Sequence, residues 1–187
     1  ARPRARPARR RRFSAAQVFL LRELHGQPTI VILIDLDRFK CVNDTHGHHV
    51  GDDLLRTVGE RLVAIAKAHG GTAAHLAGDE FLLLLPAADD DPATPVAATL
   101  TAVSQPVTLR TDDGEVTVRP SASAGFEVFD GSYGSFDTML HHADIALFHA
   151  KQQRGAHRGY APEMRMPRNT SRRDEHPTDD QPGGEAT

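Results

Sequence analysis

Residues 75–86 read HLAGDEFLLLLP, and this stretch places two adjacent acids, Asp79 and Glu80, directly before an apolar run. The run over 81–85 is apolar enough for a buried strand, and burying an unpaired carboxylate is costly. Residues 71–77 form a second candidate strand, so the Gly-Asp pair between the two runs predicts a β-hairpin. Two interpretations stay open for the acids at its tip, a turn with solvated carboxylates and a cation site.

Strands and helices alternate on both sides of this hairpin. Apolar runs and a turn at Gly114 predict further strands over 29–36, 106–110, 115–120 and 121–129. Apolar residues at helical spacing predict helices over 15–24, 52–68, 91–103 and 135–153, the last with Ser135 as its N-cap. This interleaved order predicts an α/β sandwich with one central sheet.

The two ends of the chain differ from its middle in composition. Residues 1–12 are rich in arginine and proline, and residues 162–187 are polar and acidic. Both lack the apolar content that folding needs, so we predict disordered tails around one domain over 13–161. The basic tail is compatible with nucleic-acid contact, but a solvated tail is the favoured interpretation, and no DNA or RNA partner is expected. The net charge of −3 indicates no partner.

The location of the protein is predicted from what the sequence lacks. No apolar run approaches the length of a membrane span, and the apolar segment after the arginines is too short for a signal peptide. Cys41 is the single cysteine, which excludes an internal disulfide framework and fits a reducing compartment. These observations predict a cytoplasmic location.

A third acid, Asp35, ends the predicted strand 29–36. If that strand neighbours the hairpin, Asp35, Asp79 and Glu80 meet at one edge of the sheet. Hard oxygen ligands suit Mg²⁺ (or Mn²⁺), which usually binds through one or two carboxylates plus substrate phosphates. The chemistry that such a site favours is phosphoryl or nucleotidyl transfer.

The stretch after Asp35 carries further polar candidates. Lys40 is placed to neutralise a polyphosphate as a point charge. Asn43 and Asp52 offer an amide and a carboxylate, which together can pair with guanine. Each has another interpretation, since Asn43 also forms turns and Asp52 also caps helices. Three histidines over 45–49 suggest zinc, but neither a cysteine nor a second histidine cluster at ligand spacing completes such a site.

Four separated blocks resemble one family, and they stand in the order in which that family has them: IDLDRFKCVNDTHGHHVGDDLL, AGDEFLLLLP, SASAGF and ADIALFHAK. Over residues 13–160 the chain resembles a GGDEF domain, the family of bacterial diguanylate cyclases. The resemblance implies the palm-like fold of nucleotidyl cyclases and polymerases. In that fold a central, mostly antiparallel sheet is flanked by helices, and the signature hairpin lies beside the first strand.

The resemblance also implies a reaction. Two GTP molecules condense to cyclic di-GMP with release of pyrophosphate, and each subunit of a homodimer holds one GTP, so catalysis depends largely on positioning and metal electrostatics. The alternative is a degenerate, non-catalytic GGDEF module that binds GTP or a protein partner as a regulator.

The matching positions receive roles from the same resemblance. Asp79, Glu80 and Lys151 would be catalytic, with Asp79 nearest the chemistry. The metal ligands would be Asp35, the Leu36 carbonyl, Asp79 and Glu80. The nucleotide would contact Phe39 and Lys40 along its phosphates, Asn43 and Asp52 at guanine, and Gly78 by close backbone approach.

The chain departs from the family pattern at four places. Ala77 replaces the first signature glycine, which is tolerable where the backbone angles are ordinary. His75 stands where an arginine is usual, and Gly155 stands at a second arginine position, with Arg154 beside it. Residues 68–71 read AHGG rather than R-x-x-D, which predicts no product inhibition through that segment.

Overall fold

The computed structural model describes residues 28–87, 91–129 and 136–166. The predicted helix over 15–24, the basic tail 1–12 and the N-cap Ser135 lie outside these residues. So does the predicted acidic tail, except that the described chain continues to Met166, five residues past the predicted domain end. Within the described part, no helix is long and apolar enough to cross a bilayer.

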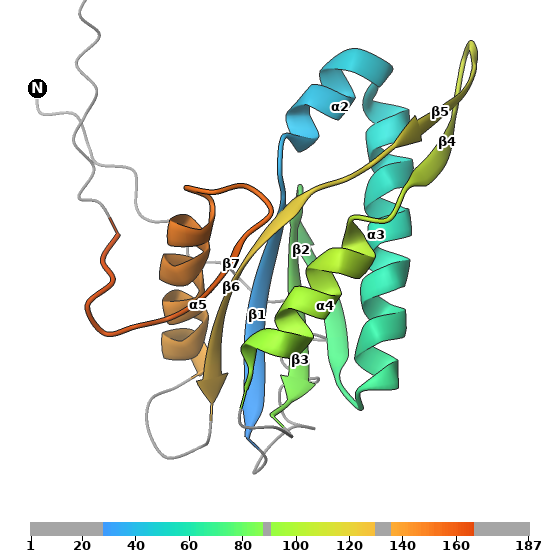
Figure 1. Cartoon of the computed structure of the whole chain (residues 1–187). Coiled ribbons are helices and arrows are strands. Elements are labelled where there is room, and N and C mark those ends of the chain that lie inside the picture. The colour runs from blue at the N-terminus through green and yellow to red at the C-terminus, as the bar shows by residue number, and fades with distance from the viewer. Residues whose placement is uncertain (1–27, 88–90, 130–135, 167–187) are drawn as a thin grey trace, which may run out of the picture.

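A five-stranded sheet forms the centre of the domain, in the order β2-β3-β1-β6-β7 (Figure 1). All neighbours pair antiparallel except β6 and β7, which run parallel. The strands are β1 (Thr29–Leu36), β2 (Thr72–Ala77), β3 (Glu80–Pro86), β6 (Ala122–Phe129) and β7 (His157–Gly159). All eight residues of β1 are buried, because helices cover both faces of the sheet at this central strand.

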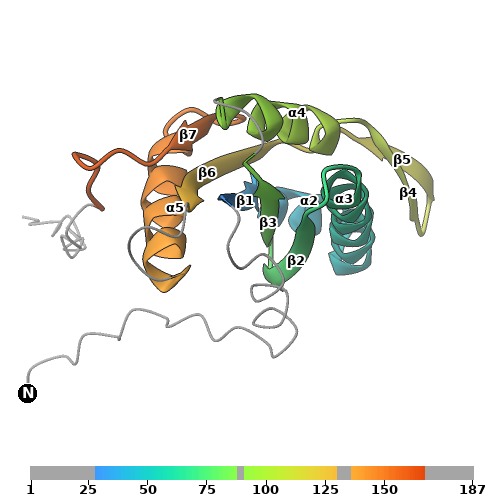
Figure 2. The ribbon, with the colours of Figure 1, turned by 90° about the horizontal axis from the view of Figure 1, so that it is seen from below.

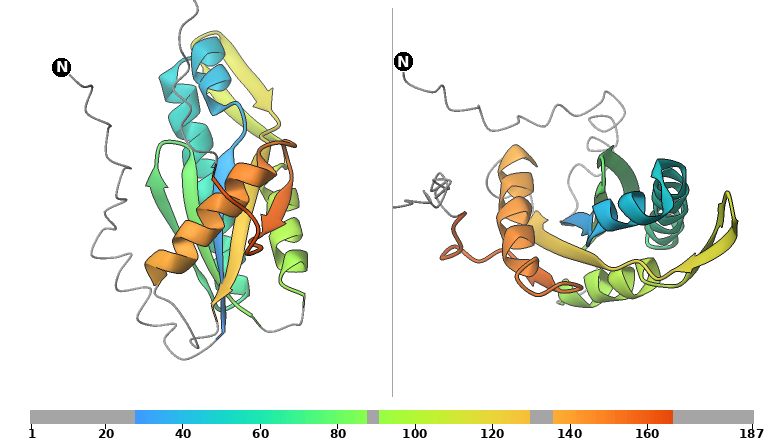
Figure 3. Two further views of the ribbon diagram at one scale, coloured as in Figure 1. Left: turned by 90° about the vertical axis from the view of Figure 1, so that its left-hand side faces the viewer. Right: turned by 90° about the horizontal axis from the view of Figure 1, so that it is seen from above.

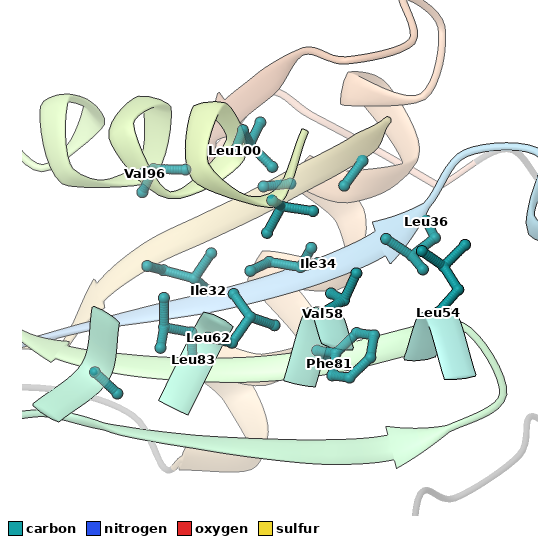
Figure 4. Close-up of a cluster of buried hydrophobic side chains, with 14 of the residues drawn as sticks. Ile32, Ile34, Leu36, Leu54, Val58, Leu62, Phe81, Leu83, Val96 and Leu100 are labelled. Atoms are coloured by element: carbon teal, nitrogen blue, oxygen red, sulfur yellow. The ribbon is translucent and has the colours of Figure 1, made fainter. Parts of the chain in front are cut away.

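Helices α3 (His48–Ala68) and α4 (Ala93–Val103) cover one face, and α5 (Phe136–Ala150) covers the other (Figure 2). Alternate side chains of β1 point to opposite faces of the sheet. Ile32 and Ile34 pack with Val58 and Leu62 of α3, as Figure 4 shows. Val31 and Leu33 pack against α5, which lies obliquely across its face (Figure 3).

Close contact between α5 and the sheet depends on Gly125 in β6. A Cβ at this position would collide with the carbonyl oxygen of Ala143 and the backbone of Leu147 in α5. The glycine of the SASAGF block therefore has a packing role, since it lets the helix approach the strand closely.

The predicted β-hairpins are confirmed, including a separate two-stranded sheet of β4 (Val107–Thr111) and β5 (Gly114–Val118). Two elements were not predicted from the sequence. Helix α2 (Phe39–His46) spans eight residues and has no fully buried residue, although Phe39 and Val42 pack against the core, and β7 is three residues long. The predicted start of the helix at Asp52 is wrong, because α3 begins at His48.

Candidate active site

Three carboxylates converge at the carboxyl end of β1. Asp35 lies directly across from Glu80 in the pairing of β1 with β3, so the two side chains leave the sheet on the same face. The backbone N–H of Leu36 donates to the carbonyl oxygen of Asp79 at 3.1 Å, which fixes the hairpin tip to the end of β1. The predicted neighbourhood of strand 29–36 and the hairpin is therefore confirmed.

Lys151, which directly follows α5, forms an ion pair with the most buried of these acids. Its Nζ lies 2.7 Å from Oδ2 of Asp35, a residue that is only 7 % exposed. Burial raises the pKa of Asp35 above its ordinary value of 3.8, although the hydrogen bond and charge of Lys151 lower it. The nearby charges of Asp79 and Glu80 raise it further. The site therefore concentrates negative charge in a partly dehydrated place, where positive charge is stabilising.

The tip of the signature hairpin has the backbone that its sequence requires. Gly78 has a φ of +58°, which an L side chain rarely adopts, and no atom lies within 4 Å of where its Cβ would be. Ala77 ends β2, and among the described residues Arg38 alone is a non-glycine with positive φ. Ala77 therefore has ordinary backbone angles, and its replacement of glycine introduces no strain.

His75 supports the same tip in place of the expected arginine. Its ring stacks on that of Phe81 with centroids 4.8 Å apart, and its Nε2 donates to the carbonyl oxygen of Gly78 at 2.7 Å. His75 therefore stabilises the turn. The sequence shows only that an arginine is replaced at this position, and it does not show the contacts that the histidine makes.

The predicted nucleotide-contacting residues lie on α2 and α3. Phe39 and Asn43 both face Gly51 of α3, where any Cβ would collide with the Asn43 amide oxygen. That oxygen is buried and has no hydrogen-bond donor among the described residues. Lys40 and Asp52 are exposed.

Both of the alternative interpretations for this segment are wrong. Asn43 lies within α2 rather than in a turn, and Asp52 lies in the second turn of α3, whose N-cap is Gly47. The structure thus brings Phe39 and Asn43 together, and it leaves Lys40 and Asp52 with exposed side chains.

Asp37 organises the site, and the sequence analysis missed it. Its Oδ1 accepts from the Ser123 hydroxyl at 2.8 Å, and its Oδ2 accepts from the Ser121 hydroxyl at 2.7 Å and from the Gly155 N–H at 2.9 Å. This carboxylate joins the end of β1, the start of β6 and the turn that carries Lys151. The partners are distant in sequence, so no local pattern could have identified them.

The acids do not form a ready metal cage in this conformation. No group of three or more His, Cys, Asp or Glu side chains among residues 28–87, 91–129 and 136–166 is arranged to hold a metal ion. The donor set still suits a hard divalent cation, because it consists of carboxylates. Burial, and to a lesser extent the charges of Asp79 and Glu80, raise the pKa of Asp35. The Lys151 ammonium provides the positive charge beside Asp35.

Comparison with known proteins identifies the family. The model described as "Diguanylate cyclase, GGDEF domain" matches residues 8–157, and the chain belongs to this family. It is 41% identical over 124 residues to the bifunctional diguanylate cyclase/cyclic di-GMP phosphodiesterase MucR of Pseudomonas aeruginosa, covering 66% of this chain and 17% of MucR. It is 35% identical over 136 residues to the diguanylate cyclase TpbB of the same species, covering 72% of this chain and 31% of TpbB. The chain thus spans less than a third of either relative.

Solved structures confirm the predicted fold class. The crystal structure of the GGDEF domain of TpbB (YfiN) matches with a TM-score of 0.65 at 32% identity, covering 76% of this chain and 89% of that one. The GGDEF domain of DgcB from Caulobacter crescentus, solved in complex with c-di-GMP, matches with a TM-score of 0.62 at 27% identity, covering 76% and 84%. The mostly antiparallel central sheet flanked by helices is thus the architecture of the family.

Proposed function

We propose that this domain is a diguanylate cyclase that condenses two GTP molecules into cyclic di-GMP within a homodimer. The observation that carries the proposal is the cluster of Asp35, Asp79 and Glu80 around the end of β1, with Lys151 paired to the buried member. A cluster of acids beside a lysine suits a reaction in which phosphate charge must be neutralised.

Magnesium, or manganese in its place, is the cofactor that these donors fit. Asp35, Asp79, Glu80 and the Leu36 carbonyl would hold it. When bound, the metal supplies neutralisation of the charge on the nucleotide phosphates. Lys151 and Lys40 would add positive charge along the same phosphates.

The protein's contribution to the reaction is mainly to hold two nucleotides in position. In each of two equivalent steps, the 3′-hydroxyl of one GTP would lose its proton to solvent and its oxygen would form a bond to the α-phosphorus of the other GTP. The bond from that phosphorus to the pyrophosphate leaving group would break. Asp79, at the hairpin tip, would lie nearest the reacting atoms. One nucleotide per subunit makes a dimer necessary, because a single subunit holds only half of the reactants.

Guanine recognition is proposed for Asn43 and Asp52. The buried Asn43 amide oxygen lacks a donor among the described residues, and a guanine N–H would supply one. The missing Cβ of Gly51 gives this amide its space. The exposed carboxylate of Asp52 would accept hydrogen bonds from the N–H donors on the same edge of guanine. Adenine lacks these donors.

A non-catalytic GGDEF regulator is the second candidate, and one observation favours it. Gly155, at the position where the family has a phosphate-binding arginine, has a φ of +73° and is tied to Asp37 through its N–H. The neighbouring Arg154 lines a cavity whose wall contains none of the three acids. This chain could therefore bind nucleotide with one phosphate contact fewer.

The deciding experiment is chromatography of the products after concentrated protein is incubated with GTP and Mg²⁺. Cyclic di-GMP and pyrophosphate from the natural sequence, but none from Asp79→Ala, would support the cyclase. The matched control is Asp112→Ala, which removes an exposed carboxylate in the β4–β5 turn. Intact GTP with saturable binding would favour the regulator, and unchanged turnover in Asp79→Ala would refute the assigned site.

We make two further predictions, one on location and one on regulation. A cytoplasmic location would be tested by fractionating cells that express the natural gene. Absence of product inhibition through residues 68–71 would be tested by adding cyclic di-GMP to the turnover assay, where an unchanged initial rate is expected.

A further inference from the structure

A cavity of about 400 Å³ lies beside the acid cluster, between the β1–α2 turn and the segment that leads into β6. We call it the β6-side cavity. Its walls are formed by residues of the 36–42 segment, by residues 118–121, and by Leu54 and Arg154. Its volume is in the range of small-molecule sites in proteins.

The β6-side cavity is separate from the proposed catalytic centre. Strand β1 lies between β3 and β6 in the sheet, so the hairpin tip with Asp79 and Glu80 borders one side of its end and the cavity borders the other. Neither these acids, nor Asp35, nor Lys151 lines the cavity. Only Leu36 and Phe39 belong to both the cavity wall and the predicted nucleotide site.

Three arginines, Arg38, Arg119 and Arg154, line the cavity and come from three separate segments. All three are exposed, and none makes a side-chain hydrogen bond or ion pair with any residue that the structure describes. The single acid in the wall is Asp37, and both of its oxygens already accept hydrogen bonds from neighbours at the site. The wall therefore carries an excess of positive charge that no described side chain neutralises.

The backbone at Arg38 strengthens this inference. Its φ of 57° lies in the left-handed region, which is unfavourable for any residue with a Cβ. Strained backbone of this kind persists mainly where a function or a packing constraint maintains it. Here it lies in the turn that places Arg38 in the wall of the same cavity as Arg119.

Most of the rest of the wall is apolar. Leu36, Val42, Leu54 and Val118 contribute side chains that suit a flat or hydrophobic body. A site of mainly apolar surface with a few charged groups at its edge is the usual form of a small-molecule pocket. Guanidinium groups bind phosphate oxygens in a bidentate manner, which gives such a site its preference for phosphate.

We propose that the β6-side cavity binds a phosphorylated small molecule with a flat or apolar body, of the size of a nucleoside monophosphate. Binding needs no divalent cation, because the wall offers arginines to the phosphate and its one carboxylate is already engaged. The cavity wall has no side-chain amide and no free carboxylate that could distinguish one base from another. The proposal does not depend on turnover at the acid cluster.

Cys41 provides a direct test, since it is the only cysteine of the chain, is exposed, and lines the cavity. The rate of alkylation by iodoacetamide, a neutral reagent, is measured with increasing AMP in the presence of EDTA. We expect AMP to slow the reaction in a saturable manner, and adenosine at the same concentrations to have no effect. Arg119→Ala and Arg154→Ala should each weaken the protection by AMP about tenfold or more. Arg158→Ala, an exposed arginine on β7, is the matched control and should leave it unchanged.

Three results would overturn the proposal: no protection by AMP, equal protection in the arginine variants, and protection that requires Mg²⁺. Loss of protection in Asp52→Ala would place the nucleotide at the proposed guanine site instead, and this too would reject the cavity. Titration calorimetry with AMP on the same variants gives an independent measure of the affinity that does not depend on the reactivity of Cys41.

Discussion

The ion pair between Lys151 and Asp35 makes a prediction about stability that does not depend on catalysis. Lys151→Met removes the ammonium and keeps much of the apolar stem. The side chain of Asp35 is 9% exposed and that of Lys151 is 42% exposed, at a separation of 2.7 Å. Loss of one partner costs about 3–5 kcal/mol in a fully buried pair and an exposed pair contributes at most about 1 kcal/mol. We therefore expect the variant to lose about 1–2 kcal/mol of unfolding free energy at pH 7.

The pH dependence of this loss follows from the pKa of Asp35. Because its pKa in the folded state lies above 3.8, the folded protein binds this proton more tightly than the unfolded chain does. The contribution of Asp35 to stability is therefore present below pH 3.8 and is lost as the pH rises through the folded pKa. Lys151 lowers that pKa, so its removal extends the loss to higher pH. The difference in unfolding free energy between the natural protein and Lys151→Met should be largest at pH 7 and should decrease as Asp35 becomes protonated.

Urea denaturation of both proteins between pH 4 and pH 8 measures this difference directly. The matched control is Lys67→Met, an exposed lysine in the last turn of α3, which should lose at most a few tenths of a kcal/mol at every pH in this interval. A loss for Lys151→Met that equals the control, or that grows toward low pH, would show that the ion pair does not act as described.

Three other substitutions test particular features of the site and its support. Asp37→Ala removes the acceptor of three hydrogen bonds, one from the fully buried Ser123, and should cost about 2–4 kcal/mol in urea denaturation; a loss below about 0.5 kcal/mol would contradict the organising role of this carboxylate. Ala77→Gly should change the rate of any GTP turnover by no more than about twofold. Gly78→Ala should destabilise the fold by about 1 kcal/mol, because position 78 has a positive φ. Equal stability of the two variants would reject this distinction. Gly125→Ala should lower the melting temperature by many degrees, because the added methyl collides with the backbone of α5; a melting curve like that of the natural protein would mean that the helix can move away freely.

Much of the fold was predictable because its central elements have strong apolar patterns. β1 is an apolar run rich in β-branched residues, and all of its residues are buried. The predicted apolar face of α5, with Met139, Ala143 and Leu147 among its members, is also buried. Helix α2 was missed because it spans only eight residues and places just two apolar side chains, those of Phe39 and Val42, against the core. The strand β7 was missed because it is held by its parallel pairing with β6 rather than by its own sequence.

The site was predictable in part for a similar reason. The acids at the ends of two predicted strands could be brought together by assuming that the strands pair, and the register of Asp35 with Glu80 confirms that step. The role of Asp37 depends on serines 84 and 86 residues further along the chain, and no sequence spacing indicates contacts of that range. The bracing role of His75 likewise depends on where the hairpin carbonyl lies.

The ion pair of Asp35 with Lys151 has a consequence for how ligands would enter the site. A divalent cation at Asp35 would compete with the lysine ammonium, and the displaced ammonium would then be available to an anion. Either ligand alone would separate Asp35 from Lys151, whereas a cation and a polyphosphate together would give both side chains new partners of opposite charge. The two affinities would then be thermodynamically coupled, and each ligand would strengthen the binding of the other by the same factor.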